Sequence, residues 1–263
     1  MWLLDTTFLE LHQVSDPTQE RYAILSHVWN LGKEDSFHSI RQLHNNIARE
    51  SPAHAEAYLA HHHKVTPKLR SLCKFARHNG YRRVWIDTCC IDQSSSAELS
   101  EAINSMYKWY LQAAICYAFL ADVDDDQDPS SPASPLRTSF RESIWFTRGW
   151  TLQELVAPRN VVFLSRHWTV LGTKTSLQDV IAEVTHISKA VLTHSAPLHS
   201  VSVAQRMSWA AGRRTTREED RAYSLLGIFG IHLPTIYGEG EQAFVRLQEE
   251  ILRRIPDQTL FAW

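Results

Sequence analysis

Three short apolar runs, separated by two amphipathic segments, lie in the first half of the chain and constrain its fold more than any other feature. The runs cover residues 22–28, 83–87 and 114–120, and their length is typical of buried strands rather than of buried helices. Between them, residues 67–79 and 97–112 repeat apolar side chains at three- and four-residue spacing, as amphipathic helices do. Strands that alternate with helices predict an α/β fold with a parallel sheet covered by helices on both faces.

The second half of the chain changes from alternating elements to helices alone. Residues 122–139 contain five aspartates and three prolines without an apolar period, which predicts a solvated loop. A short helix, a fourth strand and a further helix are predicted next, over 151–157, 160–165 and 176–183. Beyond residue 203 only helical spacing remains. We therefore expect an α/β core over 1–200 and a helical C-terminal extension over 201–263, packed on that core.

The distribution of charge argues against nucleic acid and against a membrane span. The 263-residue chain has a formal net charge of -2 and intersperses acidic with basic side chains, so we expect no basic face for a phosphate backbone. The densest charge run, 213–221, mixes both signs and predicts a salt-bridged start of a helix. The longest apolar run, 113–121, is far shorter than the ~20 residues that cross a bilayer.

Cysteine and histidine usage indicates the cytoplasm and argues against a metal site. The four cysteines do not form a spaced framework, which fits a reducing compartment, and neither end of the chain has the layout of a signal peptide. Three adjacent histidines, His61 to His63, cannot converge on one ion from a regular backbone. We expect a soluble cytoplasmic protein with no metal and no cofactor.

Five blocks of sequence resemble, in order, the fungal heterokaryon-incompatibility (HET) family. Four of them are Tyr22-Ala-Ile-Leu-Ser-His-Val-Trp29, Val84-Trp-Ile-Asp-Thr-Cys-Cys-Ile-Asp-Gln93, Ala97-Glu-Leu-Ser-Glu-Ala-Ile-Asn-Ser-Met106 and Arg148-Gly-Trp-Thr-Leu-Gln-Glu-Leu155. A fifth stretch, over 206–240, resembles the region that commonly follows in these proteins. Asn30 departs from the family pattern, which usually has glycine after the Ser-His-x-Trp motif.

The HET family is similar, more remotely, to TIR domains, and this second resemblance implies a fold and an activity. Trp150-x-x-x-Glu154 resembles the Trp-x-x-x-Glu element of TIR domains that hydrolyse NAD. The resemblance implies a TIR-like, flavodoxin-like strand order, NAD as the substrate, and a homo-oligomer when active. It also implies an upstream non-self sensor and a role as a cell-death effector of heterokaryon (vegetative) incompatibility. These implications rest on analogy between folds.

Glu154 is the candidate catalytic residue, and Trp150 is a candidate substrate-binding neighbour. On one helix, their i, i+4 spacing places them on the same face, where an indole can cover a planar base while a carboxylate holds the adjacent ribose. A fixed anion stabilises the positive charge that develops on the sugar when the nicotinamide–ribose bond breaks. The same segment also fits a capping box, in which Thr151 and Glu154 satisfy free donors at the start of the helix.

The other candidate substrate-binding residues follow two predicted strands or open the last block. Ser26, His27 and Trp29 lie at the end of the first strand, and Asp87 ends the second. Ligands of open α/β sheets bind outside the carboxyl ends of the strands, so these side chains are candidates for holding a ribose, a phosphate or a base. Each also has a structural alternative, since a histidine near a strand end can be structural and a loop carboxylate can cap a turn. Arg148 completes the set.

Two functions fit these residues. The first is a NAD glycohydrolase that kills its own cell by depleting NAD when non-self recognition brings copies together. The second is a non-catalytic, TIR-like signalling and oligomerisation module that recruits a downstream death factor and uses Glu154 only as a helix cap. Release of nicotinamide by purified, assembled protein distinguishes the two.

Overall fold

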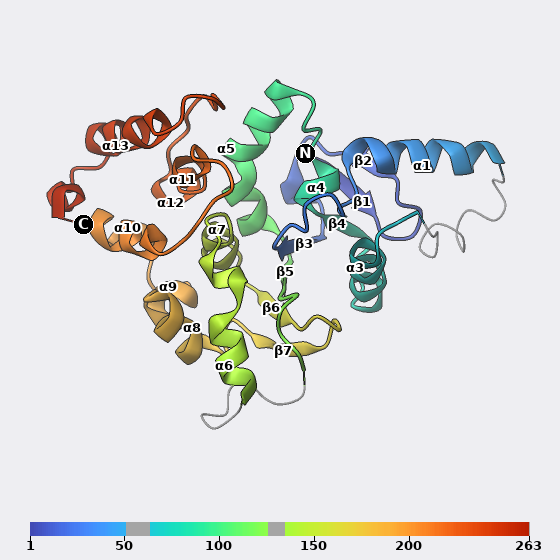
Figure 1. Cartoon of the computed structure of the whole chain (residues 1–263), viewed down its shortest axis with the longest axis horizontal. Coiled ribbons are helices and arrows are strands. Elements are labelled where there is room, and N and C mark those ends of the chain that lie inside the picture. Colours follow the sequence, from blue (N-terminus) through green and yellow to red (C-terminus); the bar gives the residue numbers. More distant parts are fainter. Residues whose placement is uncertain (51–63, 126–134, 263) are drawn as a thin grey trace.

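A seven-stranded mixed sheet forms the centre of the protein (Figure 1). The computed structural model describes residues 1–50, 64–125 and 135–262. In chain order the strands are β1 (Trp2–Asp5), β2 (Leu11–Gln13), β3 (Tyr22–His27), β4 (Arg83–Trp85), β5 (Ile115–Phe119), β6 (Val161–Leu164) and β7 (Val170–Thr173). Across the sheet they follow the order β2-β1-β4-β3-β5-β6-β7. The α/β class expected from the alternating elements is therefore confirmed.

Only the centre of the sheet is parallel. β4, β3, β5 and β6 pair in parallel, whereas β1 pairs antiparallel with β4 and β7 pairs antiparallel with β6. The expected parallel sheet thus forms the centre, and antiparallel strands that were not predicted extend it on both sides. The three strands outside this parallel centre, β1, β2 and β7, have three or four residues, and β7 includes the exposed Val170 and a glycine. Such short segments lack the continuous apolar run that identifies a strand buried on both faces.

Helices cover both faces of this sheet and continue to the C-terminal end. They are α1 (Phe37–Glu50), α3 (Pro67–His78), α4 (Asp87–Cys90), α5 (Ser96–Gln112), α6 (Pro135–Glu142), α7 (Thr151–Val156), α8 (Gln178–Thr185), α9 (Lys189–Leu192), α10 (Val203–Ala211), α11 (Asp220–Tyr223), α12 (Leu226–Phe229) and α13 (Gln242–Arg254). Short 3-10 turns lie at η1 (Pro17–Gln19), η3 (Ile144–Thr147), η4 (Leu198–Ser200) and η5 (Gln258–Ala262). In the part of the chain described, no helix combines the length and the apolar character that a membrane span needs.

The predicted boundaries differ from the structure most clearly in two places. The second strand ends before Asp87, which instead opens α4. The loop expected over 122–139 gives way to α6 at Pro135, a residue favoured at the first helical position. Phe140 anchors α6, because its ring is fully buried and packs 5.1 Å from the ring of Phe163 in β6. Apolar contacts with other parts of the chain thus hold this helix, and local spacing does not reveal them.

The alternating side chains of β3 connect the two helical layers. On one face, the Tyr22 hydroxyl donates to the carbonyl of Trp109 in α5, and Ser26 contacts α7. On the other face, His27 contacts Lys68 in α3. All six residues of β3 are buried, as expected for a central strand covered on both sides. The carboxyl end of β3 therefore meets α7 on one face and α3 on the other.

The helical extension rests on helices of the core rather than on the sheet itself. α12 packs against α5, where Asn104 exchanges hydrogen bonds of 2.9 and 3.0 Å with the backbone of Leu233. In Figure 1 the extension, in orange and red, lies at the end of the molecule opposite α1. α10 to α13 therefore form the outer layer over α5 and α7.

Replacement of Gly227 by alanine should weaken the contact between α12 and α5. A Cβ atom built on Gly227 would lie 2.1 Å from the Cβ of Tyr107, so one of the helices must shift. Overpacking of this kind costs about 1–3 kcal/mol, which corresponds to a fall of several degrees in the midpoint of thermal unfolding. Gly212→Ala is the matched control, because nothing lies within 4 Å of its added methyl group. Equal midpoints for the two variants would contradict this packing.

Candidate functional site

A buried chain of hydrogen bonds links the end of β3 to Glu154 in α7. The indole N–H of Trp145 donates to Ser26 Oγ at 2.8 Å, and the Ser26 hydroxyl donates to the Glu154 carboxyl group. Ser26 and Trp145 are fully buried, and Glu154 is 4% exposed. The structure thus brings together Ser26 and Glu154, which lie 128 positions apart in the sequence.

Burial controls the protonation of Glu154. Desolvation raises the pKa of its carboxyl group to about 8, and the negative charge of Asp87 acts in the same direction. The hydrogen bond from Ser26, a polar contact with Tyr110 and the positive charge of Arg213 act in the opposite direction. At neutral pH the carboxyl group is therefore mostly protonated, and its charge responds to whatever lies beside it.

Glu154 is not a helix cap. The residue before α7 is Trp150, which makes no capping hydrogen bond with its side chain. The Thr151 hydroxyl donates to the carbonyl oxygens of Trp145 and Arg148, and the Glu154 side chain points to Ser26 of β3. The capping-box alternative is therefore wrong, because both side chains have partners other than the free N–H groups at the start of α7.

A second chain of polar contacts runs along the other face of β3. Lys68 Nζ lies 3.0 Å from His27 Nδ1, and His27 Nε2 lies 3.0 Å from Asp87 Oδ1. Because an ammonium group only donates, Nδ1 accepts and Nε2 carries the proton that His27 donates to Asp87. The Trp29 indole donates to the other Asp87 oxygen at 2.7 Å, and Glu34 pairs with Lys68.

Exposure separates the members of this second chain. The Trp29 residue is 40% exposed and the Asp87 side chain 18%, but the His27 side chain is only 1% exposed. A ligand at this edge of the sheet would reach Trp29 and Asp87 first. The buried His27 connects Lys68 to Asp87 and orients the Asp87 carboxylate.

The remaining two candidates contact the helical extension. The Arg148 guanidinium donates to Thr216 Oγ1 at 2.9 Å. The Trp150 side chain makes a hydrogen bond that lowers the pKa of Asp220, whereas burial, the larger influence, raises it. Trp150 directly precedes α7 and Glu154 lies within it, but the two side chains have partners in different parts of the fold.

Several residues of the site have no signal in the sequence. Trp145, Tyr110, Lys68 and Arg213 act through partners that lie far away along the chain. For Arg213 the sequence predicts a salt-bridged helix start, but its guanidinium donates to neutral oxygens. Only contacts in three dimensions identify such residues.

A buried lysine holds the C-terminal end of α7. Lys174 is 2% exposed, and its ammonium group donates to the carbonyl oxygens of Leu155, at 3.1 Å, and of Pro158. Burial lowers the pKa of Lys174 to about 8. A cation at this end of a helix satisfies its free carbonyl groups and is favoured by the helix dipole.

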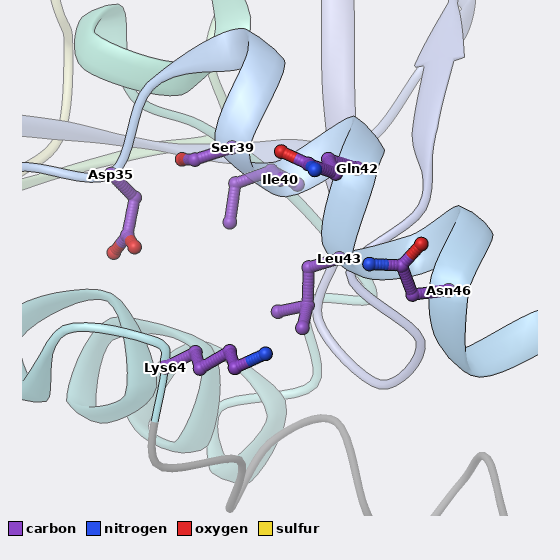
Figure 2. A pocket seen from close by; sticks show the side chains of 7 residues that line it. All are labelled: Asp35, Ser39, Ile40, Gln42, Leu43, Asn46 and Lys64. Atoms are coloured by element: carbon purple, nitrogen blue, oxygen red, sulfur yellow. The ribbon is translucent and has the colours of Figure 1, made fainter.

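A cavity lies away from the Glu154 group, beside α1 and the segment that leads into α3 (Figure 2). Its volume is about 220 Å³, and its lining residues are Asp35, Ser39, Ile40, Gln42, Leu43, Asn46 and Lys64. Asp35 accepts hydrogen bonds from the backbone and hydroxyl of Thr66. This carboxylate thus fixes the start of α3, and the cavity is separate from the Glu154 group.

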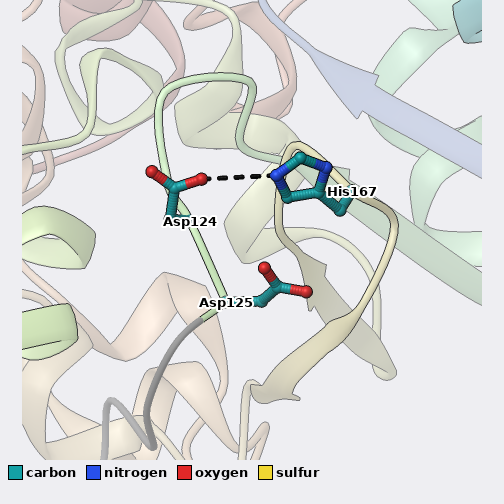
Figure 3. A group of neighbouring side chains, drawn as sticks. All are labelled: Asp124, Asp125 and His167. Atoms are coloured by element: carbon teal, nitrogen blue, oxygen red, sulfur yellow. Dashed lines mark ion pairs between the residues drawn. The ribbon is translucent and has the colours of Figure 1, made fainter.

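One cluster of possible metal ligands lies at the surface (Figure 3). Asp124, Asp125 and His167 place their ligand atoms within 4.8 Å of one another. Arg166 donates to both oxygens of Asp124, and Thr169 donates to Asp125. Both carboxylates therefore already accept hydrogen bonds from protein side chains. The histidines His61 to His63 lie outside the described residues.

Comparison with known proteins places this sequence among incompatibility proteins. A family model described as heterokaryon incompatibility protein (HET) matches residues 22–138, and a domain of unknown function (DUF8212) matches residues 242–263. The vegetative incompatibility protein HET-E-1 of Podospora anserina is 46% identical over 232 residues, which cover 88% of this chain and 16% of that protein. No solved structure matches the chain.

The HET match extends from β3 into α6. It includes Ser26, His27, Trp29 and Asp87 but ends before Glu154. The resemblance carried by the five sequence blocks is thus supported by a family model and by a relative that aligns with most of the chain. This chain belongs to the heterokaryon incompatibility protein family.

Proposed function

We propose that this chain is a TIR-like NAD glycohydrolase that acts in the cell-death response of vegetative incompatibility. The observation that carries the proposal is the convergence of Ser26, Asp87 and Glu154 at the carboxyl ends of β3 and β4, where open α/β sheets bind ligands. The four parallel strands support it further. Across the sheet these strands follow the order β4-β3-β5-β6. Numbered by their place in the chain, this is the order 2-1-3-4 that is found in flavodoxin-like folds.

The reaction needs one carboxylate near the sugar. When the nicotinamide–ribose bond breaks, its electrons move to the ring nitrogen and neutralise the pyridinium, so the leaving group needs no proton. Positive charge develops on the sugar, and an ionised Glu154 would stabilise it more in the transition state than in the ground state. Water then adds to the sugar carbon and loses a proton, which gives ADP-ribose.

In this structure the site around Glu154 is closed. With 4% of its surface exposed, Glu154 cannot contact a nucleotide until neighbouring side chains move. It is also mostly protonated at neutral pH, since its pKa is about 8. A cationic nicotinamide ring beside it would favour the ionised form. We infer that self-association, driven by an upstream sensor, opens the site and that NAD binding then releases a proton from Glu154.

The closed carboxyl group also favours a second candidate function. If Glu154 stays buried in every state, the chain is a signalling and oligomerisation module that recruits a downstream death factor. Trp29, which is 40% exposed at the end of β3, would then contact a protein rather than a base. Nicotinamide release separates the two functions.

Glu154→Gln should make the protein more stable, and the gain should grow with pH. Since the folded-state pKa lies above the ordinary value of 4.5, the native state binds a proton that the unfolded chain has lost, and stability falls between about pH 4.5 and 8. The full shift of the Glu154 pKa corresponds to roughly 5 kcal/mol in the free energy of unfolding. Glutamine can still accept from Ser26 but does not titrate. Urea unfolding of both proteins from pH 5 to 9 measures the difference, and a gap that does not change with pH would contradict the burial of an ionisable group.

Glu154→Gln should also abolish NAD cleavage in a folded protein. We expect kcat to fall at least about 100-fold, as for the loss of other preorganised electrostatic contacts. The assay follows nicotinamide release by protein that is concentrated on a surface or fused to an oligomerising domain. Glu249→Gln, which neutralises an exposed carboxylate in α13, is the control and should keep wild-type activity. Full activity of Glu154→Gln would contradict the catalytic role of Glu154. Inactivity of the assembled wild-type protein would favour the signalling module.

A further inference from the structure

Arg213 joins the helical extension to the first turn of α7. It follows the end of α10, and its Nη1 donates to the carbonyl of Arg148 at 2.8 Å and to Thr151 Oγ1 at 2.9 Å. Its Nε donates to the carbonyl of Trp209 in α10 at 3.1 Å. One planar guanidinium thus bridges α10 and the start of α7, a geometry that the single amine of lysine cannot reproduce.

Backbone contacts hold the same segment in place. The Arg214 N–H donates to the carbonyl of Thr147 at 2.7 Å, and its carbonyl accepts from the N–H of Gly149 at 2.9 Å. A Cβ atom on Gly149 would lie 2.5 Å from the side chain of Thr215, so the two backbones approach closely. The extension is therefore locked to the turn from which α7 begins.

The positive charge of Arg213 does not stabilise helix α7 itself. A cation near the N-terminal end of a helix opposes the helix dipole, and the three hydrogen bonds of Arg213 go to neutral oxygens. Burial lowers the pKa of Arg213 to about 10, so the group stays charged at neutral pH. The anion that its charge favours is Glu154, whose carboxyl group lies in the same first turn.

Two charged groups act on Glu154, and they act in opposite directions. The residues that face it from neighbouring elements are Ser26 of β3, Tyr110 of α5, Cys116 of β5, Asp87 of α4 and Arg213. Burial raises the pKa of Tyr110 and of Cys116 well above the usual values, so both are neutral at physiological pH. Asp87 favours the protonated carboxyl group, and Arg213 favours the carboxylate.

We propose that Arg213 is a positioning residue for Glu154, through which the helical extension fixes the first turn of α7 and supplies the positive charge that favours the carboxylate. The catalytic consequence rests on the proposed NAD-hydrolase function. The placement and protonation of Glu154, however, are measurable without a substrate. The α/β core and the extension then form one site, although only the core carries the candidate residues found by sequence motif.

The experiment follows the Glu154 carboxyl group by ¹³C NMR titration in the full chain, with its signal assigned by loss in Glu154→Gln. Arg213→Met should raise the titration midpoint, so that at least threefold less carboxylate is present at pH 7. It should also shift the pH profile of kcat toward alkaline pH while KM changes less. Arg159→Met removes an exposed cation just beyond α7 and should leave both measurements at wild-type values.

Arg213→Lys provides the second arm, because it keeps the charge but cannot make the forked contact. We expect a midpoint near that of wild type and amide hydrogen exchange in α7 that is several-fold faster. An unchanged midpoint in folded Arg213→Met, or unchanged exchange in Arg213→Lys if the methionine variant does not fold, would overturn the proposal. A shifted midpoint in a protein that releases no nicotinamide would support the positioning role and remove only the NAD-hydrolase function.

Discussion

The hydrogen bond from Ser26 to Glu154 is the contact on which the arrangement of this protein depends. It joins the central strand of the sheet to α7, a helix of six residues that are all buried. An isolated helix of this length is unstable in water, so tertiary contacts must set its position. Ser26 fixes its middle, while Lys174 and Arg213 hold its two ends. The carboxyl group of Glu154 is therefore placed by three separate parts of the chain.

The same contact creates a conflict between stability and charge. Burying a carboxyl group in an apolar layer favours its neutral form, yet the proposed chemistry needs the anion. Two charged residues act on Glu154 in opposite directions, because Asp87 favours the neutral carboxyl group and Arg213 favours the anion. A small change in either, or a cation that binds between them, would change the charge of Glu154. Sites in which charge is finely balanced in this way are common where proteins carry out chemistry.

The sequence was sufficient for the central strands and for half of the site. β3 and β5 are buried strands and are therefore continuous apolar runs. Ser26 and Asp87 were found because they lie at the carboxyl ends of the runs over 22–28 and 83–87. β1, β2 and β7 were not predicted, because these strands have only three or four residues and contain no such run. Lys68, Tyr110 and Arg213 were missed for another reason. Their partners are single atoms in distant elements, several of them backbone carbonyls, which leave no pattern in the local sequence.

The order of the strands also determines which fragments of this chain can be stable. The segment matched by the HET family model ends at residue 138, before β6 begins. β5 pairs with β6 over four residues, from Cys116↔Val161 to Phe119↔Leu164, so a fragment cut at that boundary would leave one side of β5 unpaired. An apolar strand from the middle of a sheet would become an open edge, which is a template for aggregation. The smallest soluble piece of this protein therefore has to extend past β6 and, if α7 is to keep its place, past Arg213.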